Sequence, residues 1–261
     1  MNNNNPFEKQ IKVAVLNKLI EDNVITEKTI IINELVIDSF SRRADLVLIN
    51  KNSITAFEIK SEADSLVRLT GQVEKYLLYF DKVIVVTTNK HIEKIIKSVP
   101  QQVGVWQFNK DNIIKKNRGK KESIPEKNNY LDFLKVNELK KLAKNSGLIL
   151  KNNSKTKIKE ELKSSLNKAS INNIKNFTIE MLKNRYSMPS NLFVSSVLLK
   201  NKVDTNDFEL LKPYIQKKSI IDPLFPASQD GESDDSFLET LAKESALPIF
   251  GGIPEKIKKL I

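Results

Sequence analysis

The runs RADLVLIN at residues 43–50 and ITAFEIK at residues 54–60 are the most informative part of this chain for its fold. Both are rich in apolar and β-branched residues, which predicts two short strands. If the turn between them is centred on residues 51–52, Asp45 lies directly across from Glu58 on one face of an antiparallel hairpin. Lys60 follows Glu58 by two residues, so its side chain shares that face.

Two carboxylates that face each other across a hairpin repel, and a divalent cation is the simplest group that offsets the repulsion. Mg²⁺ is often held by one or two carboxylates together with water and substrate phosphate. Such an ion activates water and neutralises charge on a phosphate, and an ammonium such as that of Lys60 adds a further positive charge. If the preceding hairpin turns at residues 39–40, Glu34 faces Asp45 from the other side as a third acid. The competing interpretation is a solvated strand face with an incidental salt bridge, in which Arg43 pairs with Asp45 or Glu58.

Around this hairpin, residues 1–110 predict an α/β domain in the order α-β-β-β-α-β-α-β, which is a mixed sheet with helices on its faces. Apolar residues at helical spacing predict helices, and continuous or alternating apolar runs predict strands. The expected helices cover residues 7–20, 64–80 and 92–98, and the expected strands cover residues 29–37, 43–49, 54–60, 83–87 and 103–108. His91 is expected at the surface at a helix start, and Trp106 in the core.

The helix expected over residues 64–80 carries a polar stripe beside its apolar stripe. Asp64, Arg68, Gln72 and Tyr76 recur every four residues, with Asp64 as the expected N-cap. Because this stripe borders the face that packs on the sheet, its side chains can reach the acidic end of the hairpin. Ordinary packing on the helix surface is the alternative interpretation for Gln72 and Tyr76.

The rest of the chain is divided by composition. Residues 111–128 are rich in Lys and Asn and predict a basic linker, and residues 129–220 predict an all-helical, basic domain. One helix is expected through Leu131 and Leu142, with Gly147 ending it in a left-handed conformation. Residues 221–261 predict a partly mobile acidic segment followed by a C-terminal tail.

Charge and composition narrow the functional classes. The chain of 261 residues has no Cys and one His, which excludes disulfides, thiolate metal sites and a Cys nucleophile. The net charge is +11, and residues 111–220 carry 24 Lys and Arg against 11 Asp and Glu, as a polyanion-binding face requires. A chain rich in Lys, Asn and Ile with few Arg is also what A+T-rich codon usage produces.

No apolar run approaches the roughly 18–20 residues that span a bilayer, and the N-terminus lacks signal-peptide features, so we expect a cytoplasmic protein without a membrane partner.

The ordered set of Asp45, Glu58-Ile59-Lys60 and Gln72-x-x-x-Tyr76 resembles the PD-(D/E)XK nuclease superfamily, in particular its RecB-like branch with a QxxxY motif. With Glu34, Arg43, Asp64, Arg68 and residues 80–83, it is similar to a poorly characterised family of bacterial and phage proteins in that superfamily. The resemblance covers about residues 5–110 and implies a restriction-endonuclease-like fold. It implies that Asp45, Glu58, Glu34 and the carbonyl of Ile59 bind Mg²⁺ or Mn²⁺. It also implies that Lys60 positions water or stabilises the transition state, and that Gln72 and Tyr76 shape the pocket.

A second, weaker resemblance concerns the helical region. The run Leu134 to Ala143, then Gly147-Leu148, Ser154 to Lys157 and Leu162 looks like a SAP-type helix-extended-helix DNA-binding motif. Its connecting stretch is longer than usual and lacks the customary Gly before the second helix. A generic helical bundle is the alternative.

These features together predict a Mg²⁺- or Mn²⁺-dependent deoxyribonuclease in which Asp45, Glu58, Lys60, Gln72 and Tyr76 are catalytic and Arg43 and Arg68 bind substrate. The alternative is a nuclease fold that binds DNA or protein without cleaving. A third expectation is that the basic region recruits a protein partner.

Overall fold

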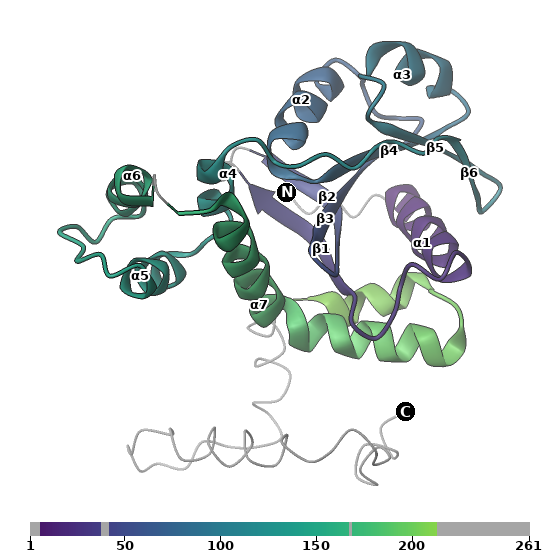
Figure 1. The fold of residues 1–261 in the computed structure, drawn as a ribbon. Helices are drawn as coiled ribbons and strands as arrows, with labels where there is room; N and C mark the ends of the chain where they lie inside the picture. The colour runs from purple at the N-terminus through teal and green to yellow at the C-terminus, as the bar shows by residue number, and fades with distance from the viewer. Residues whose placement is uncertain (1–5, 38–41, 167–168, 213–261) are drawn as a thin grey trace, which may run out of the picture. The chain divides into compact units, whose positions relative to one another are not determined.

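The computed structural model describes residues 6–37, 42–166 and 169–212, and its centre is a six-stranded mixed sheet (Figure 1). The strands lie in chain order: β1 (Ile30–Ile37), β2 (Arg42–Asn50), β3 (Ser53–Lys60), β4 (Lys82–Thr88), β5 (Gly104–Asn109) and β6 (Asn112–Asn117). β1 to β3 pair antiparallel, β3 to β5 pair parallel, and β6 returns antiparallel to β5. The mixed α/β architecture with a helical C-terminal region is therefore confirmed.

The register of the central hairpin is as predicted. Asn50 pairs with Ser53, and the pairing continues to Leu46 opposite Phe57, which places Asp45 and Glu58 next in line. Lys51 adopts a left-handed conformation with φ of 53°, which tightens the turn. The predicted β1–β2 turn at residues 39–40 lies outside the described residues, although the pairing of the two strands has the expected register.

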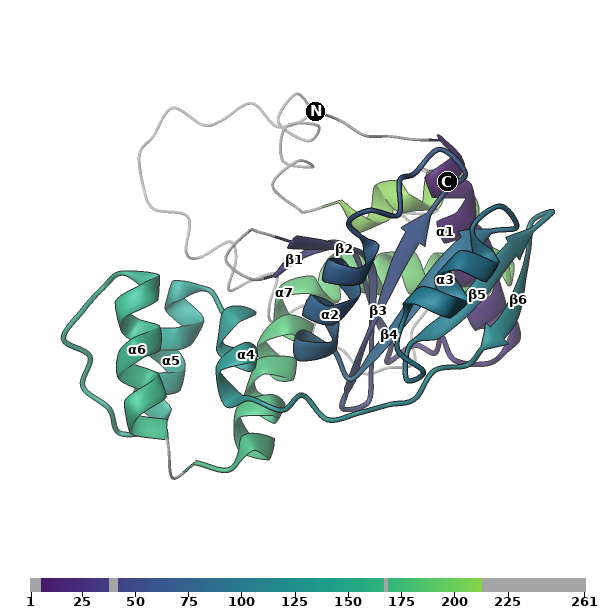
Figure 2. The same cartoon turned by 90° about the horizontal axis from the view of Figure 1, so that it is seen from above.

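Helices cover both faces of the sheet. α2 (Leu69–Tyr79) and α3 (Ile92–Ser98) lie on one face, and α1 (Pro6–Glu21) lies on the other (Figure 2). The apolar side chains around the sheet form two separate clusters, one between α1 and the sheet and one between α2, α3 and the sheet, and a third cluster lies within the helical region. The bulk of the sheet is therefore buried on both sides, as the continuous apolar run in β4 indicates.

Several predicted boundaries need correction. α2 begins at Leu69 rather than near residue 64, with Arg68 at its N-cap. Asp64 caps no helix, because its carboxylate accepts hydrogen bonds from the backbone nitrogen and hydroxyl of Ser61, at 2.7 and 2.5 Å. His91 does stand at the start of α3, but it is buried rather than at the surface, whereas Trp106 is buried as predicted.

The predicted linker over residues 111–128 contains a strand, β6. This strand was missed because four of its six residues are Asn or Lys, which mask the pattern of a half-exposed edge strand. Only Ile113 is buried among its residues, on the face shared with α1.

The helical region comprises α4 (Lys127–Asp132), α5 (Val136–Asn145), α6 (Lys155–Ser165), α7 (Ile171–Lys200) and a 3₁₀ helix, η3 (Thr205–Leu211). The single helix predicted through Leu131 and Leu142 is in fact two, α4 and α5. Gly147 has a φ of +70° just after α5, as predicted, and the backbone nitrogen of Leu148 donates to the carbonyl of Ala143 at 2.9 Å. The predicted acidic segment and tail at 221–261 lie outside the described residues.

α7 joins the helical region to the sheet. Its first half contributes Ile179 and Leu182 to the α2-side cluster, and its second half contributes Phe193 and Val197 to the α1-side cluster. Between them, the hydroxyl of Ser190 accepts a hydrogen bond from the backbone nitrogen of Ile31 in β1 at 2.8 Å. The edge strand is therefore covered by α7, which satisfies polar groups that would otherwise face another chain.

A buried ion pair reinforces this junction. Asp81, which is 1% exposed, pairs with Lys175 of α7 and accepts a hydrogen bond from the backbone nitrogen of Ile54 at 2.8 Å. Within the helical region predicted as a separate domain, α7 thus shares its packing with the sheet, whereas α5 and α6 pack in a cluster of the helical region itself.

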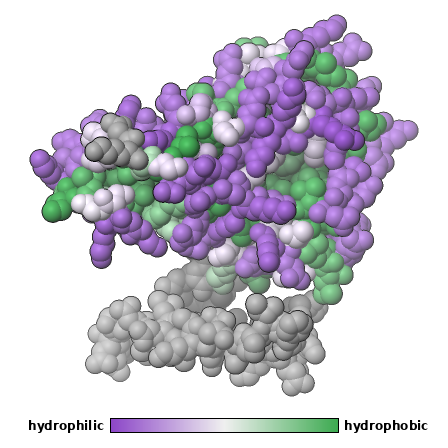
Figure 3. Space-filling view, viewed as in Figure 1, coloured by the Kyte–Doolittle hydropathy of each residue, from purple (hydrophilic) through white to green (hydrophobic). Residues whose placement is uncertain are grey.

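The face shown in Figure 3 is mostly hydrophilic, with hydrophobic patches, one of them at the end that carries α5 and α6. Ile149, in the loop between these helices, is 87% exposed. Among the described helices, none combines the length and hydrophobicity needed to cross a membrane.

Candidate active site

The candidate site forms where the regular alternation of β1 and β2 is broken. Ile32 and Leu35 of β1 both pack in the α2-side cluster although they are three residues apart, because Glu34 between them has a left-handed φ of 63°. The pairing of β1 with β2 is interrupted at the same level, between Leu46 and Ala44, so Asp45 lies at the irregularity. Local interruptions of this kind occur frequently beside active sites because they redirect side chains.

Glu58 is the centre of the site. It is 1% exposed, and its two carboxylate oxygens have different partners. Oε1 lies 2.5 Å from Nζ of Lys60, and Oε2 lies 2.8 Å from the hydroxyl of Tyr76. A buried carboxylate needs such partners because an unpaired charge away from water is very costly.

Asp45 adjoins this group. Its Oδ2 accepts a hydrogen bond from the backbone nitrogen of Ile59 at 2.7 Å, which fixes the carboxylate beside the end of β3. Burial, and after it the negative charge of Glu58, together raise the pKa of Asp45 to about 8. Burial and the charge of Glu58 also raise the pKa of Tyr76. The two acids are therefore close enough to interact, as the hairpin register predicts.

The donor set suits a hard divalent ion. Within the described residues, no three His, Cys, Asp or Glu side chains come together as a ligand group. Asp45 and Glu58 nevertheless provide the one or two carboxylates with which proteins commonly hold Mg²⁺, leaving the remaining positions to water and phosphate. The role of the Ile59 carbonyl as a further ligand stays a prediction.

Glu34 does not join this set. Its Oε2 lies 3.0 Å from Nη1 of Arg43, and its side chain is 37% exposed. The left-handed backbone at Glu34 explains the difference, because it breaks the alternation on which the cross-strand prediction depended. The guanidinium of Arg43 pairs with Glu34 rather than with Asp45 or Glu58. The backbone carbonyl of Arg43 accepts a hydrogen bond from the hydroxyl of Tyr76 at 2.7 Å.

The α2 residues lie at different depths. Tyr76 is fully buried and reaches the carboxylate directly. Gln72, one helical turn earlier, is half-buried, and Arg68 is exposed at the N-cap. Their roles in shaping the pocket and binding substrate stay predictions.

α1 contributes residues that the sequence analysis missed. Lys12 is 4% exposed, lies 2.8 Å from Glu8, and donates to the side-chain oxygen of Asn33 in β1 at 3.1 Å. Burial and Glu58 dominate the raised pKa of Asp45; the positive charge of Lys12 offsets a smaller part of this rise, and the negative charge of Glu8 adds to it. The sequence offered one indication that Lys12 is buried, because it directly follows Ile11, which lies on the apolar stripe of the first helix.

Comparison with known proteins shows the family. The protein-family model described as Bacteriophage P4 protein cII matches residues 1–212 of this chain. Protein cII of Enterobacteria phage P4 is 38% identical to this chain over 210 residues, covering 78% of this chain and 77% of the phage protein. A solved structure of a Silicibacter pomeroyi protein of unknown function shares 13% identity with a TM-score of 0.35, over 53% of this chain and 93% of that one. Because the family match spans most of the sequence, this chain belongs to the Bacteriophage P4 protein cII family.

Proposed function

We propose that this protein is a nuclease that uses Mg²⁺ or Mn²⁺ to hydrolyse DNA phosphodiester bonds, on a restriction-endonuclease-like fold of the PD-(D/E)XK superfamily. The observation that carries the proposal is the buried group of Glu58, Lys60 and Tyr76 with Asp45 beside it. An acid pair in a water-poor site is unfavourable by itself, and it becomes favourable when a cation is bound.

Each residue has a distinct task in this proposal. Asp45 and Glu58 would hold the ion, which supplies a Lewis acid and an activated water. Lys60 neutralises Glu58 in the structure, and its ammonium is suited to facing the phosphate that approaches the ion. Tyr76 donates to Glu58 and so fixes the orientation of the carboxylate.

The basic helical region supports a polyanionic substrate. Residues 111–220 carry 24 Lys and Arg against 11 acids, and α5, an intervening loop and α6 follow the helix-extended-helix order of a SAP-type motif. Contacts of Lys and Arg with phosphates would give an affinity that falls steeply with salt.

The test is incubation of the purified chain with linear, circular and single-stranded DNA and either Mg²⁺ or Mn²⁺. We expect cleavage by the wild type, and loss of cleavage in Glu58→Ala and Lys60→Ala variants whose circular dichroism shows a folded chain. Glu62→Ala is the matched control, because Glu62 is an exposed acid close to the site in sequence. Cleavage retained by Glu58→Ala would refute the assignment.

A second candidate is a module on the same fold that binds DNA or protein without cleaving it. Two observations favour it: Lys60 and Tyr76 already contact both carboxylate oxygens of Glu58, and Glu34 pairs with Arg43. Such a protein would bind DNA equally well with and without Mg²⁺ and would never cleave it.

A further inference from the structure

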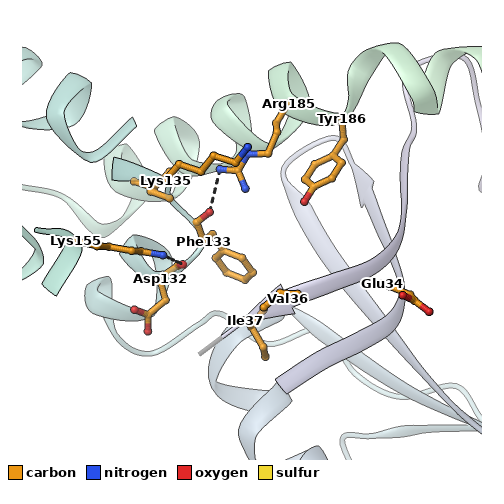
Figure 4. A pocket seen from close by; sticks show the side chains of 10 residues that line it. Glu34, Val36, Ile37, Asp132, Phe133, Lys135, Lys155, Arg185 and Tyr186 are labelled. Atoms are coloured by element: carbon orange, nitrogen blue, oxygen red, sulfur yellow. Dashed lines mark hydrogen bonds between the residues drawn. The ribbon is translucent and has the colours of Figure 1, made fainter. Parts of the chain in front are cut away.

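A cavity of about 240 Å³ lies between the end of β1 and the helices that follow the sheet (Figure 4). Its lining comes from β1, the α4–α5 junction, the start of α6 and the middle of α7. Pockets that enclose a whole drug-sized ligand measure roughly 300–1,000 Å³, so this one suits a single unit of a longer ligand.

Positive charge predominates in this cavity. Lys135, Lys155 and Arg185 line it, and so do two acids, Asp132 and Glu34. Both acids are paired with cations that are not part of the lining, Asp132 with Lys159 and Glu34 with Arg43.

Two of the three cations, Arg185 and Lys155, are held by neighbouring groups, whereas Lys135 is exposed. Arg185 pairs with Glu138 and also donates to the carbonyl of Phe133 at 3.1 Å. Lys155 donates to the carbonyl of Asp132 at 3.2 Å. Burial lowers the pKa of Lys155, and the charge of Arg185 lowers it as well, while the charge of Glu138 partly offsets both, so Lys155 and Arg185 repel each other. Among the described residues, neither Lys135 nor Lys155 forms an ion pair, and an anion would relieve this repulsion.

An aromatic side chain completes the cavity. Tyr186 projects from α7 into it, opposite the side of β1 that carries Val36, and the guanidinium carbon of Arg185 lies 5.7 Å from the centre of the Tyr186 ring (Figure 4). A half-buried ring beside cations is the combination with which proteins bind single-stranded nucleic acid, through base stacking and phosphate contacts.

The cavity is connected to the candidate active site through a short series of contacts. Glu34 lines the cavity and pairs with Arg43, whose carbonyl accepts a hydrogen bond from the hydroxyl of Tyr76. The same hydroxyl lies 2.8 Å from Glu58. The cavity and Glu58 are therefore joined by three residues in contact, Glu34, Arg43 and Tyr76.

We propose that this cavity binds one nucleotide of a single-stranded nucleic acid, with its phosphate at Lys135, Lys155 and Arg185 and its base against Tyr186. The biological role of this cavity rests on the proposed nuclease function, because a nucleotide bound there would hold the strand next to the bond that is cleaved. Its binding chemistry does not need the ion, and the two proposals can therefore fail separately.

The experiment measures fluorescence anisotropy of a short labelled oligothymidylate with the full chain in EDTA, so that no cleavage occurs. Tyr186→Leu is expected to weaken binding about tenfold, since stacking on an aromatic side chain is worth about 1–3 kcal/mol per base. Lys135→Gln is expected to weaken binding and to reduce the slope of log K against log salt by about 0.7, the value for one phosphate contact on a single strand. Lys97→Gln, at an exposed position on α3, is the charge-matched control.

Variants that bind as tightly as Lys97→Gln while keeping the wild-type melting temperature would overturn the proposal. Equal losses on a duplex of the same length would overturn the single-strand assignment. If the predicted losses occur but the wild type never cleaves DNA with Mg²⁺ or Mn²⁺, the cavity assignment stands and the nuclease proposal fails.

Discussion

Replacing Asp45 by Asn should stabilise the metal-free protein, although it removes a residue central to the proposed activity. The backbone nitrogen of Ile59 donates to Asp45, and the side-chain oxygen of Asn can accept the same hydrogen bond. The variant therefore keeps the local geometry and removes only the buried charge beside Glu58.

The size of the effect follows from the pKa of Asp45, which burial and then Glu58 raise from its ordinary value of 3.8 to about 8. Between these two values the folded state holds a proton that the unfolded state has lost, so the stability of the wild type falls as pH rises. At 1.36 kcal/mol per pH unit the full difference at pH 8 is about 6 kcal/mol. Because Asp45 keeps some exposure, water screens part of this cost, and we expect a measured gain of about 2–4 kcal/mol.

The assay is urea denaturation of wild type and Asp45→Asn in EDTA at several pH values from 4 to 9. The stability difference should be near zero at the acidic end, grow up to about pH 8, and become constant above it. Adding Mg²⁺ should stabilise the wild type more than the variant, because a bound ion compensates the paired acids. A variant that is less stable than wild type by the same amount at every pH would refute the interpretation of Asp45 as a strained, ion-binding acid.

Three further predictions concern stability and the support of the site. Breaking the buried ion pair, by Asp81→Asn or Lys175→Met, should lower the free energy of unfolding in urea by about 3–5 kcal/mol, and the double variant should lose less than the two single losses combined. Gly119→Ala should destabilise the chain by more than 1 kcal/mol, because the φ of Gly119 is +69° and an added Cβ would lie 2.4 Å from the backbone nitrogen of Gly104. Gly71→Ala on α2, where an added Cβ has no atom within 4 Å, should raise the melting temperature slightly. Tyr76→Phe should cost about 1.5–3 kcal/mol and reduce metal-dependent cleavage, since the buried carboxylate loses a donor; unchanged stability and cleavage would show that this hydrogen bond is unimportant.

The hairpin that carries the site was predictable because two kinds of signal agree there. Strand composition defines β2 and β3, and the short connection between them sets the register that places Asp45 and Glu58 next in line after Leu46 and Phe57. The position of Lys60 then follows from the two-residue period of a strand. These are local rules, and the structure follows them at this point.

The features that were missed depend on contacts or backbone conformations that the local sequence does not specify. A left-handed φ at Glu34 is unusual for a residue other than Gly, and it directs this acid to Arg43. β6 was missed because an edge strand can be composed of Lys and Asn when its partner strand provides the hydrogen bonds. The position of α7 across β1 depends on pairings such as Ser190 with Ile31, which are far apart in the chain.

The most direct test of the central claim is a titration of the protein with Mn²⁺, followed by electron paramagnetic resonance of the free ion. We expect wild type and Glu34→Gln to take up a single ion with similar affinity, and Asp45→Asn and Glu58→Gln to bind it at least tenfold more weakly. Equal uptake by Glu58→Gln and wild type would contradict the claim that these two strand acids form the ion site.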